Sequence, residues 1–221
     1  MSLRGVVDHV LHPRRRGHGV RLVIAAVLLV ASVLPVERRS VPDPEAELFR
    51  WVNGLPDFLD GPISLVMQLG NFLAVPALAV AALVAFRRWR VALDLAISGT
   101  AAWLLARVVK ESVERGRPGD LLQDVILRDA PSTGLGFVSG HAAVAAALAT
   151  VVAAYLGARW TVTVIVLAAI VAFARVYVGA HLPLDVVGGA AMGWALGSLV
   201  HFLVLPEITG EDPEELVARE G

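Results

Sequence analysis

The chain has 221 residues, of which 57% are hydrophobic, and its mean hydropathy is +0.69. This composition is too apolar for an ordinary soluble domain of that size and predicts a polytopic membrane protein. A net charge of −1 without a long basic run argues against nucleic acid as a partner, and the lack of cysteine excludes disulfides, thiolate metal sites and a cysteine nucleophile.

The chain begins with an arginine-rich segment that leads into a first apolar run. Residues 1–19 form the predicted cytosolic basic N-terminus, and the apolar run extends from Leu22 to Val36. A secretory signal peptide would end in a small-residue cleavage site, whereas this run closes on Pro35-Val36-Glu37-Arg38-Arg39. We therefore expect a membrane helix, with an uncleaved signal anchor as the alternative.

Apolar stretches of membrane-spanning length recur along the rest of the chain. A helix needs about 20 apolar residues to cross a bilayer, and the sequence contains six such stretches. They cover approximately residues 20–36, 63–86, 91–109, 142–158, 160–178 and 186–205. The sequence thus predicts an all-α membrane protein with one six-helix domain, residues 20–205. Residues 206–221 form an acidic C-terminal tail that we expect to be solvated.

A shorter helix is predicted between the first two spans. Asp43-Pro44 is a helix-start signal that combines a capping side chain with a proline at the first helical position, and Gly54-Pro56 indicates a break after it. One face of this helix carries Leu48, Val52, Leu55 and Leu59. This pattern favours a helix that lies in the membrane interface.

Three polar clusters interrupt the apolar chain, and ionisable groups beside membrane helices indicate function by default. The first two flank the connection between the third and fourth predicted spans, and the third lies between the fifth and sixth. Because two crossings separate these connections, we expect all three clusters on the same side of the membrane. They are Lys110 with Arg117-Pro118, then Ser139-Gly140-His141, and then Arg175 with His181 and Asp185.

The positive charges beside the spans predict which side that is. Ten Lys and Arg residues fall on the side of the N-terminus and eight on the opposite side, with Arg107 left inside the third span. The bias grows if Lys110, Arg117 and Arg175 belong to a site. By the positive-inside rule, we expect a cell-membrane protein with cytosolic termini and the clusters facing outward.

The residue types in the clusters suit a phosphate group. Lys110 and Arg117 are about two helical turns apart and can point the same way. Arg175 adds a third cation, and guanidinium forks match phosphate oxygens well. Ser139 can cap the following helix, whose free N–H groups would face an anion, and Gly140 permits close backbone approach. We expect these five residues to bind phosphate.

The remaining three residues can perform the chemistry. His181 and Asp185 are four residues apart, so in a helical turn the carboxylate can bond one ring nitrogen and leave the other free as a nucleophile. Pro183 would be tolerated early in that helix. His141 could protonate the leaving oxygen and then activate water. Three cations can stabilise the phosphoryl oxygens in place of Mg²⁺, so no metal or other cofactor is expected.

The three spaced clusters resemble the signature motifs of the type 2 phosphatidic acid phosphatase (PAP2) superfamily, over roughly residues 45–205. The resemblance implies a six-helix membrane phosphatase that acts on lipid phosphates without a metal. It also implies that His181 is the nucleophile, Asp185 its orienting partner and His141 the general acid. Two positions depart from the family pattern. Val138 stands where proline is usual and Ala174 where serine is usual, and the loss of the serine removes one possible phosphate hydrogen bond.

Several other polar residues have simpler interpretations. A single arginine near a helix end is usually a snorkelling anchor, which is the interpretation we give Arg107 and Arg115. Asp185 taken alone could merely cap the sixth span. Gly189, Gly193 and Gly197, spaced by four, are explained by close helix packing. Structural hydrogen bonding is expected of His9, His12, His18 and His201.

Substrate and partners are predicted only as a class. We expect a lipid phosphate or prenyl diphosphate at the bilayer surface, such as phosphatidic acid, phosphatidylglycerol phosphate or an undecaprenyl-type phosphate. The apolar face of the loop from Gly119 to Phe137, formed by residues 121–127, could guide a lipid tail or act as a lid. The alternative is a membrane transporter or binding protein that uses the same cations without hydrolysis. A soluble vanadate haloperoxidase shares the motifs but not the hydropathy. The sequence carries no signal for oligomeric state.

Overall fold

A computed structural model describes residues 18–36, 39–85 and 87–204, which are helical throughout apart from their connections and one isolated bridge between Gly116 and Leu135. The predicted all-α class is confirmed. The basic N-terminal segment up to residue 17, with His9 and His12, and the acidic tail from residue 205 lie outside the described residues.

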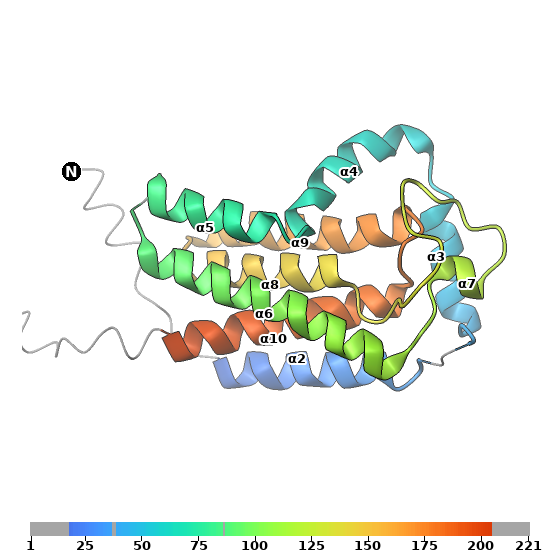
Figure 1. The fold of residues 1–221 in the computed structure, drawn as a ribbon, viewed down its shortest axis with the longest axis horizontal. Coiled ribbons are helices and arrows are strands. Elements are labelled where there is room, and N and C mark those ends of the chain that lie inside the picture. Colours follow the sequence, from blue (N-terminus) through green and yellow to red (C-terminus); the bar gives the residue numbers. More distant parts are fainter. Residues whose placement is uncertain (1–17, 37–38, 86, 205–221) are drawn as a thin grey trace, which may run out of the picture.

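The helices that form the bundle run alongside one another (Figure 1). They are α2 (His18–Val33), α5 (Ala74–Val84), α6 (Trp89–Val113), α8 (Gly140–Ala154), α9 (Ala158–Tyr177) and α10 (Pro183–Val204). α8 packs against α6, α9 and α10, and α2 packs against α10. The alanine-rich α8 is therefore the centre of the bundle, and most of its side chains are buried.

Small residues permit the close contact between α8 and α10. A Cβ atom at Gly189 would collide with the Ser139 carbonyl, and one at Gly193 would collide with the Ala143 carbonyl. At Gly197 it would lie 2.8 Å from the carbonyl oxygen of Ala147. The interpretation of the three glycines as packing residues is confirmed, because the backbone of α8 occupies the space that a side chain would need.

Length and composition single out α6, α9 and α10 as helices that could cross a membrane. A fourth candidate span is the bent pair Asp57–Gly70 and Ala74–Val84, while α2 and α8 are shorter apolar helices. The count of six spans therefore stays a prediction. Large apolar side chains such as Val80, Leu104 and Val162 are exposed on the bundle, as a hydrocarbon environment requires.

The second predicted span, residues 63–86, is not one straight helix. It consists of α4 (Asp60–Met67), a 3₁₀ turn η2 (Gln68–Gly70) and α5, and its two parts are bent by 71°. The break lies at Asn71, which is extended and accepts a hydrogen bond from the Leu73 N–H at 3.1 Å. Gly70 packs so closely on His141 that an added Cβ would lie 2.6 Å from its carbonyl oxygen. The bend thereby brings this segment against the start of α8.

α3 (Asp43–Asn53) covers one end of the bundle. The predicted break after it is confirmed, because Gly54 follows the helix and Pro56 precedes the 3₁₀ turn η1 (Asp57–Leu59). The predicted capping side chain is wrong, since Pro42 is the N-cap residue and no side chain caps the helix. Of the predicted apolar face, Val52 is buried, Leu55 and Leu59 pack against the same core cluster, and Leu48 is exposed. Phe49 is buried in that cluster too, and the position of the helix in the membrane interface stays a prediction.

The connection from α7 (Pro118–Leu121) to α8 is packed against this end. Leu121, Leu122 and Val125 contact the core cluster around Tyr177, while Ile126 and Leu127 are exposed. Arg128 holds the segment down, because its guanidinium donates to the Asn53, Leu55 and Tyr177 carbonyls at 2.8–2.9 Å. The structure thus shows a tethered cap, and its role as a lid or lipid guide stays a prediction.

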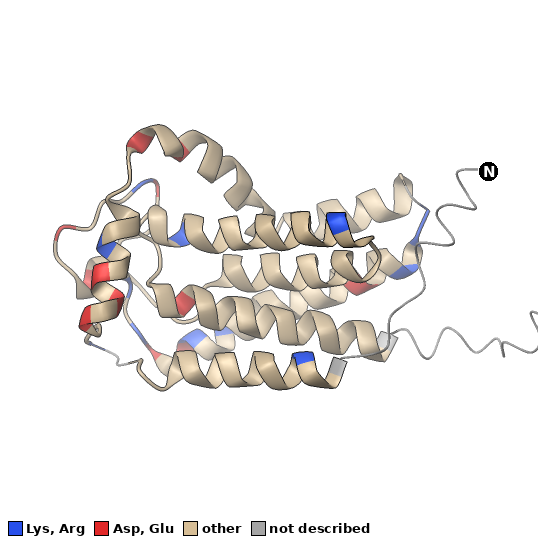
Figure 2. Ribbon diagram, turned by 180° about the vertical axis from the view of Figure 1, so that it is seen from behind, with Lys and Arg blue, Asp and Glu red and all other residues tan. Residues whose placement is uncertain are grey.

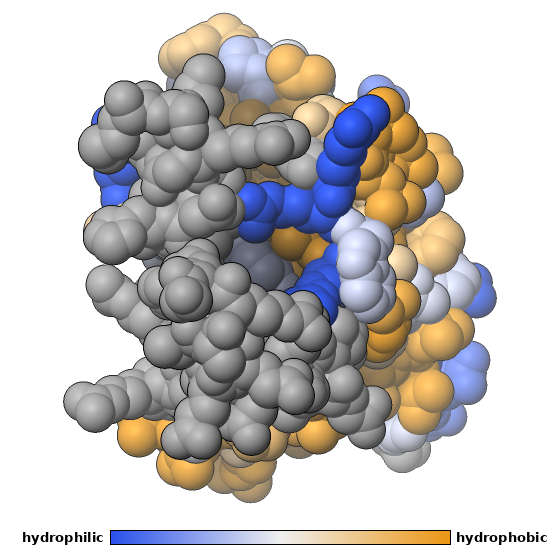
Figure 3. Space-filling model, turned by 90° about the vertical axis from the view of Figure 1, so that its left-hand side faces the viewer, coloured by the Kyte–Doolittle hydropathy of each residue, from blue (hydrophilic) through white to orange (hydrophobic). Residues whose placement is uncertain are grey.

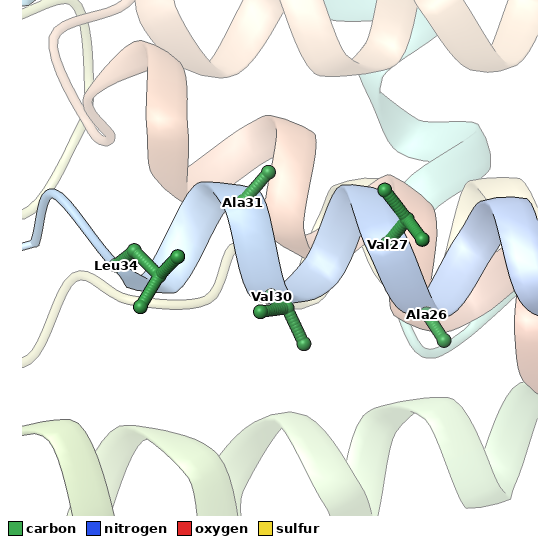
Figure 4. A pocket seen from close by; sticks show the side chains of 5 residues that line it. All are labelled: Ala26, Val27, Val30, Ala31 and Leu34. Atoms are coloured by element: carbon green, nitrogen blue, oxygen red, sulfur yellow. The ribbon is translucent and has the colours of Figure 1, made fainter.

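Charged residues gather toward the two ends of the bundle, and long middle stretches of the helices carry none (Figure 2). The end at which α6 begins shows strongly hydrophilic residues beside a mostly hydrophobic flank (Figure 3). On α2, a shallow apolar hollow of about 380 Å³ is lined by Ala26, Val27, Val30, Ala31 and Leu34 (Figure 4). This distribution is the one expected of a helical bundle whose flanks contact lipid and whose ends contact water.

Candidate active site

The three sequence clusters meet at the end of the bundle that α3 covers (Figure 1). Lys110 is in the last turn of α6 and Arg117 precedes α7. Ser139, Gly140 and His141 form the start of α8. Arg175 is in the last turn of α9, His181 lies in the turn that follows, and Asp185 is in the first turn of α10. All eight predicted site residues therefore lie at one end.

The turn between α9 and α10 sets the position of His181. Gly179 has a φ of +78°, and an added Cβ there would lie 2.6 Å from the Ile126 carbonyl oxygen, so only glycine suits this sharp turn. The backbone N–H of His181 donates to the Arg175 carbonyl at 3.1 Å. Pro183 then begins α10, where its missing N–H and fixed φ are tolerated.

His181 and Asp185 face each other across this turn. The His181 Nδ1 and Asp185 Oδ2 atoms are 3.5 Å apart, within ion-pair range but longer than the usual hydrogen bond of about 2.7–3.2 Å. The same Oδ2 accepts a hydrogen bond from the Leu182 N–H at 2.9 Å. Asp185 therefore caps the start of α10 and faces His181 at once. The His181 Nδ1 atom makes no hydrogen bond to the described residues, and the nucleophilic role of His181 stays a prediction.

The three cations are anchored with donors to spare. The Lys110 ammonium donates to the carbonyls of Leu135 and Gly136, both at 2.9 Å. Arg117 donates one Nη1 bond to the Ala180 carbonyl at 3.0 Å, and Arg175 Nη1 contacts the Met67 sulfur at 3.3 Å. The buried Nε atoms of both arginines donate to no atom of the residues that the structure describes. These N–H groups suit the oxygens of an anion.

The electrostatic environment keeps His181 neutral. Burial lowers the pKa of His181 well below its ordinary value, and the positive charges of Lys110, Arg175 and Arg117, with His141, lower it further. A neutral imidazole carries the lone pair that a nucleophile needs. The four charged or imidazole groups that lower the pKa of His181 come from all three clusters, so the three clusters lie close to this ring.

The start of α8 faces the same place. Ser139 is its N-cap residue, and its hydroxyl accepts a hydrogen bond from the Ala142 N–H at 3.4 Å, so the predicted cap is confirmed. The Ser139 N–H donates to the Asp185 carbonyl at 2.9 Å and ties α8 to α10. Around Gly140, an added Cβ would approach nothing closer than the Ala106 Cβ at 4.0 Å. His141 is only half-buried, which leaves it open to a substrate.

Sequence reasoning missed two residues of this region, Arg115 and Glu45. Arg115 was expected to be a snorkelling anchor, but it is completely buried and donates from Nη1 to Asp185 Oδ1 at 2.9 Å. It also pairs with both carboxylate oxygens of Glu45, at 3.1 and 2.5 Å. Only the short spacing of Arg115 from Arg117 could have indicated this role. Arg107 fits its surface interpretation, with its guanidinium 4.3 Å from the centre of the Trp103 ring.

The positive charges of the site come from the side chains of Lys110, Arg117 and Arg175. Within residues 18–36, 39–85 and 87–204, no three His, Asp or Glu side chains are grouped so that they would hold a metal ion. The two departures from the motif pattern, Val138 and Ala174, are both fully buried. They pack beside the site without removing any of the eight polar or glycine residues.

Comparisons with known proteins agree on a family. The family model of the PAP2 superfamily matches residues 89–207. The undecaprenyl-diphosphatase of Sulfolobus acidocaldarius is 32% identical over 169 residues, which cover 74% of this chain and 79% of that protein.

Two solved structures share the fold. Aquifex aeolicus LpxE superposes with a TM-score of 0.66 and 26% identity, over 71% of this chain and 94% of that chain. The transmembrane PAP2-type phosphatidylglycerolphosphate phosphatase of Bacillus subtilis has a TM-score of 0.63 and 22% identity, over 83% and 95% of the two chains. The second likeness is one of fold alone.

Proposed function

The chain belongs to the PAP2 superfamily, and from that premise we propose that it removes phosphate from a lipid phosphate or prenyl diphosphate through a phosphohistidine intermediate and without a metal. It is a multi-pass membrane protein and a lipid phosphatase by its relatives, one of which is an undecaprenyl-diphosphatase. The observation that supports the mechanism is a buried, neutral His181 among three cations, two of which, Arg117 and Arg175, have Nε–H groups without a partner in the described residues.

The first step transfers the phosphoryl group to the protein. The lone pair of His181 Nε2 forms the N–P bond while the bond from phosphorus to the lipid oxygen breaks, and His141 gives that oxygen a proton. Lys110, Arg117 and Arg175 stabilise the charge on the phosphoryl oxygens. Bound phosphate brings negative charge next to His141, which favours the protonated form that this step needs.

The second step releases inorganic phosphate. His141, now neutral, takes a proton from water as that water attacks phosphorus, and the N–P bond returns its electron pair to His181. Asp185 faces the imidazolium on its Nδ1 side at 3.5 Å and stabilises the positive charge present in the intermediate. His181, His141 and Asp185 thus take part in the formation and the breakdown of the intermediate. The three cations stabilise the phosphoryl oxygens, as Mg²⁺ does in many phosphoryl-transfer enzymes.

Phosphate release by the purified protein tests this function. A panel of phosphatidic acid, phosphatidylglycerol phosphate, undecaprenyl phosphate and undecaprenyl diphosphate is incubated with the protein in detergent and a chelator. Wild-type protein should release phosphate from at least one of them, and His181→Ala should release none. Failure of folded wild-type protein on every substrate would favour transport or binding.

We also propose that the termini are cytosolic and that the site faces outward. Because the chain contains no cysteine, single introduced cysteines give clean reporters. Ser132→Cys marks the exposed loop at the site end and Arg159→Cys the opposite end. A membrane-impermeant maleimide should label the first in intact cells and spare the second, and the reverse pattern would invert the topology.

A further inference from the structure

The strongest feature that the mechanism leaves unused is the ionic network behind Asp185. Arg115 lies between two carboxylates, those of Asp185 and Glu45, and the three side chains are 0%, 0% and 5% exposed. Isolated buried charges are costly, and the cost is offset only where partners and hydrogen bonds are complete. Arg115 Nη1 and Nη2 are paired with the two carboxylates, while its buried Nε donates to no atom of the described residues. The Nη bonds therefore set the geometry of the network.

Arg115 fixes the orientation of the Asp185 carboxylate. Its Nη1 bonds Oδ1 at 2.9 Å, while the Leu182 N–H bonds Oδ2 at 2.9 Å. With both oxygens engaged, the carboxylate cannot rotate, and Oδ2 remains directed at the His181 ring. The backbone of Gly136 also lies close to this carboxylate, since an added Cβ there would lie 3.0 Å from Oδ2.

The same arginine supports the phosphate-binding side of the site. Its backbone carbonyl accepts a hydrogen bond from the Gly136 N–H at 2.7 Å. The Gly136 carbonyl in turn accepts from the Lys110 ammonium at 2.9 Å. Arg115 thus connects Asp185, the partner of His181, to the loop at Gly136 that binds Lys110.

Glu45 provides a second carboxylate that pairs with Arg115. It accepts bonds from Arg115 and also from the Leu184 N–H at 2.9 Å, so it joins α3 to the start of α10. Burial lowers the pKa of Arg115, but its bonds and charge interactions with Glu45 and Asp185 outweigh burial and raise the pKa above its ordinary value. Two carboxylates against one guanidinium leave one excess negative charge. Without Glu45, Arg115 would neutralise Asp185 and weaken its attraction for a cationic His181.

We propose that Arg115 and Glu45 are positioning residues for the reaction. Arg115 holds Asp185 in place for His181, and Glu45 balances Arg115 so that one negative charge remains to meet the imidazolium formed when His181 takes the phosphoryl group. This proposal rests on the proposed function above, because it requires His181 to become cationic during turnover.

The test separates positioning from mere stability by kinetics. Glu45→Gln and Arg115→Met are compared with two matched controls outside the network. Glu47→Gln removes an exposed carboxylate of the same helix, and Arg107→Met removes an exposed arginine of α6. Both network variants should lower kcat by about 10- to 100-fold, as outer-shell partners of active groups do, with KM changed less than about threefold. Both controls should retain wild-type kcat.

The pH profiles give the readout that a structural role would not produce. His181 is faced by Lys110 from α6, Arg117 before α7, His141 from α8, Arg175 from α9 and Asp185 from α10. Arg115→Met removes a positive charge behind Asp185, so protonation of His181 becomes easier and the acid limb of kcat/KM moves to higher pH. Glu45→Gln removes a negative charge, so the limb moves to lower pH. Because the same substrate is used for every variant, its own titration affects all the pH profiles equally and does not change the difference between them.

Opposite shifts with lowered kcat would support the proposal. Parallel or absent shifts, a loss confined to KM, or a kcat equal to that of the controls would overturn it. Should Arg115→Met fail to fold, Glu45→Gln alone decides, because glutamine keeps the shape and the acceptor of glutamate. Wild-type phosphate release and its loss in His181→Ala are measured in the same assay, so failure of this proposal is distinguishable from failure of the proposed function.

Discussion

The bundle contains two buried pairs of aspartate and histidine, one at each end, and they differ in what surrounds them. At the site end, His181 Nδ1 and Asp185 Oδ2 are 3.5 Å apart. At the opposite end, His201 Nδ1 lies 2.9 Å from Asp94 Oδ2, and the Tyr155 hydroxyl donates to the same oxygen at 2.7 Å. The pair that is further apart belongs to the candidate active site, so tight pairing is no mark of catalysis.

The neighbours explain the difference. Three cations with unused donors surround His181, whereas an aromatic ring meets His201 edge-on, with the Tyr155 centroid 5.2 Å away. Asp94 is on α6, His201 on α10, and Tyr155 directly follows α8, so this pair joins three helices inside an apolar bundle. Polar contacts of this kind hold membrane helices together. We therefore expect the pair of His181 and Asp185, which lies among cations, to take part in the reaction, and the pair of His201 and Asp94 to hold helices together.

The largest expected effect is the loss of activity when His181, the histidine of the pair at the site end, is removed. His181→Ala should reduce kcat by about 10³-fold or more, because it removes the proposed nucleophile. The matched variant His201→Ala should retain wild-type kcat per folded molecule while lowering Tm. Phosphate release and thermal unfolding in detergent measure both. If the two variants lost equal activity, the distinction between the pairs would be untenable.

Removal of one cation should have the next largest effect. Lys110→Met should lower kcat/KM by about 10²–10³-fold, as the loss of one transition-state donor does. The positive charge of Lys110 lowers the pKa of His181, so its loss should raise that pKa and move the acid limb of kcat/KM to higher pH. Arg107→Met serves as the control. An unchanged limb in Lys110→Met would mean that Lys110 does not act on His181.

Chelators and vanadate sharpen the comparison without a mutation. If cations alone stabilise the phosphoryl oxygens, EDTA should leave the rate within about twofold of its starting value. Orthovanadate, which resembles a five-coordinate phosphoryl group, should compete with substrate. Strong sensitivity to EDTA that added Mg²⁺ restored would contradict the metal-free mechanism.

The smallest expected effect on activity is at the opposite end. Tyr155→Phe removes one hydrogen bond to the buried Asp94 carboxylate, which should cost about 1–3 kcal/mol of unfolding free energy. Turnover at the site end should stay at the wild-type rate. A Tm unchanged by Tyr155→Phe would show that the hydrogen bond from Tyr155 to Asp94 contributes little to holding the helices together.

The features that could be predicted are those that depend on the spacing of residues along the sequence. The order of the three clusters and the number of helices between them are enough to place Lys110, His141 and His181 at one end of the bundle. The Ser139 cap follows from a local rule, since it depends on a neighbour within one turn. The spacing by four of the α10 glycines predicts one closely packed helix face, although the helix that they contact, α8, is distant in the sequence.

The features that long-range contacts create could not be predicted. Arg115 meets Glu45 and Asp185, each 70 positions away, and a single arginine near a helix end gives no sign of such partners. The bend after Gly70 depends on contact with His141, which is 71 positions further along. The burial of Phe49 beside Val52 likewise follows from the packing of α3 on α9 and α10.

Direct trapping of the covalent intermediate tests the central claim most sharply. Wild-type protein is mixed with a lipid phosphate labelled in its phosphoryl group, quenched in alkali, where phosphohistidine is stable, and digested for mass spectrometry. We predict a phosphoryl adduct on His181 that forms and decays at rates compatible with turnover and that His181→Ala lacks. Steady turnover with no adduct, or an adduct on another residue, would contradict the account.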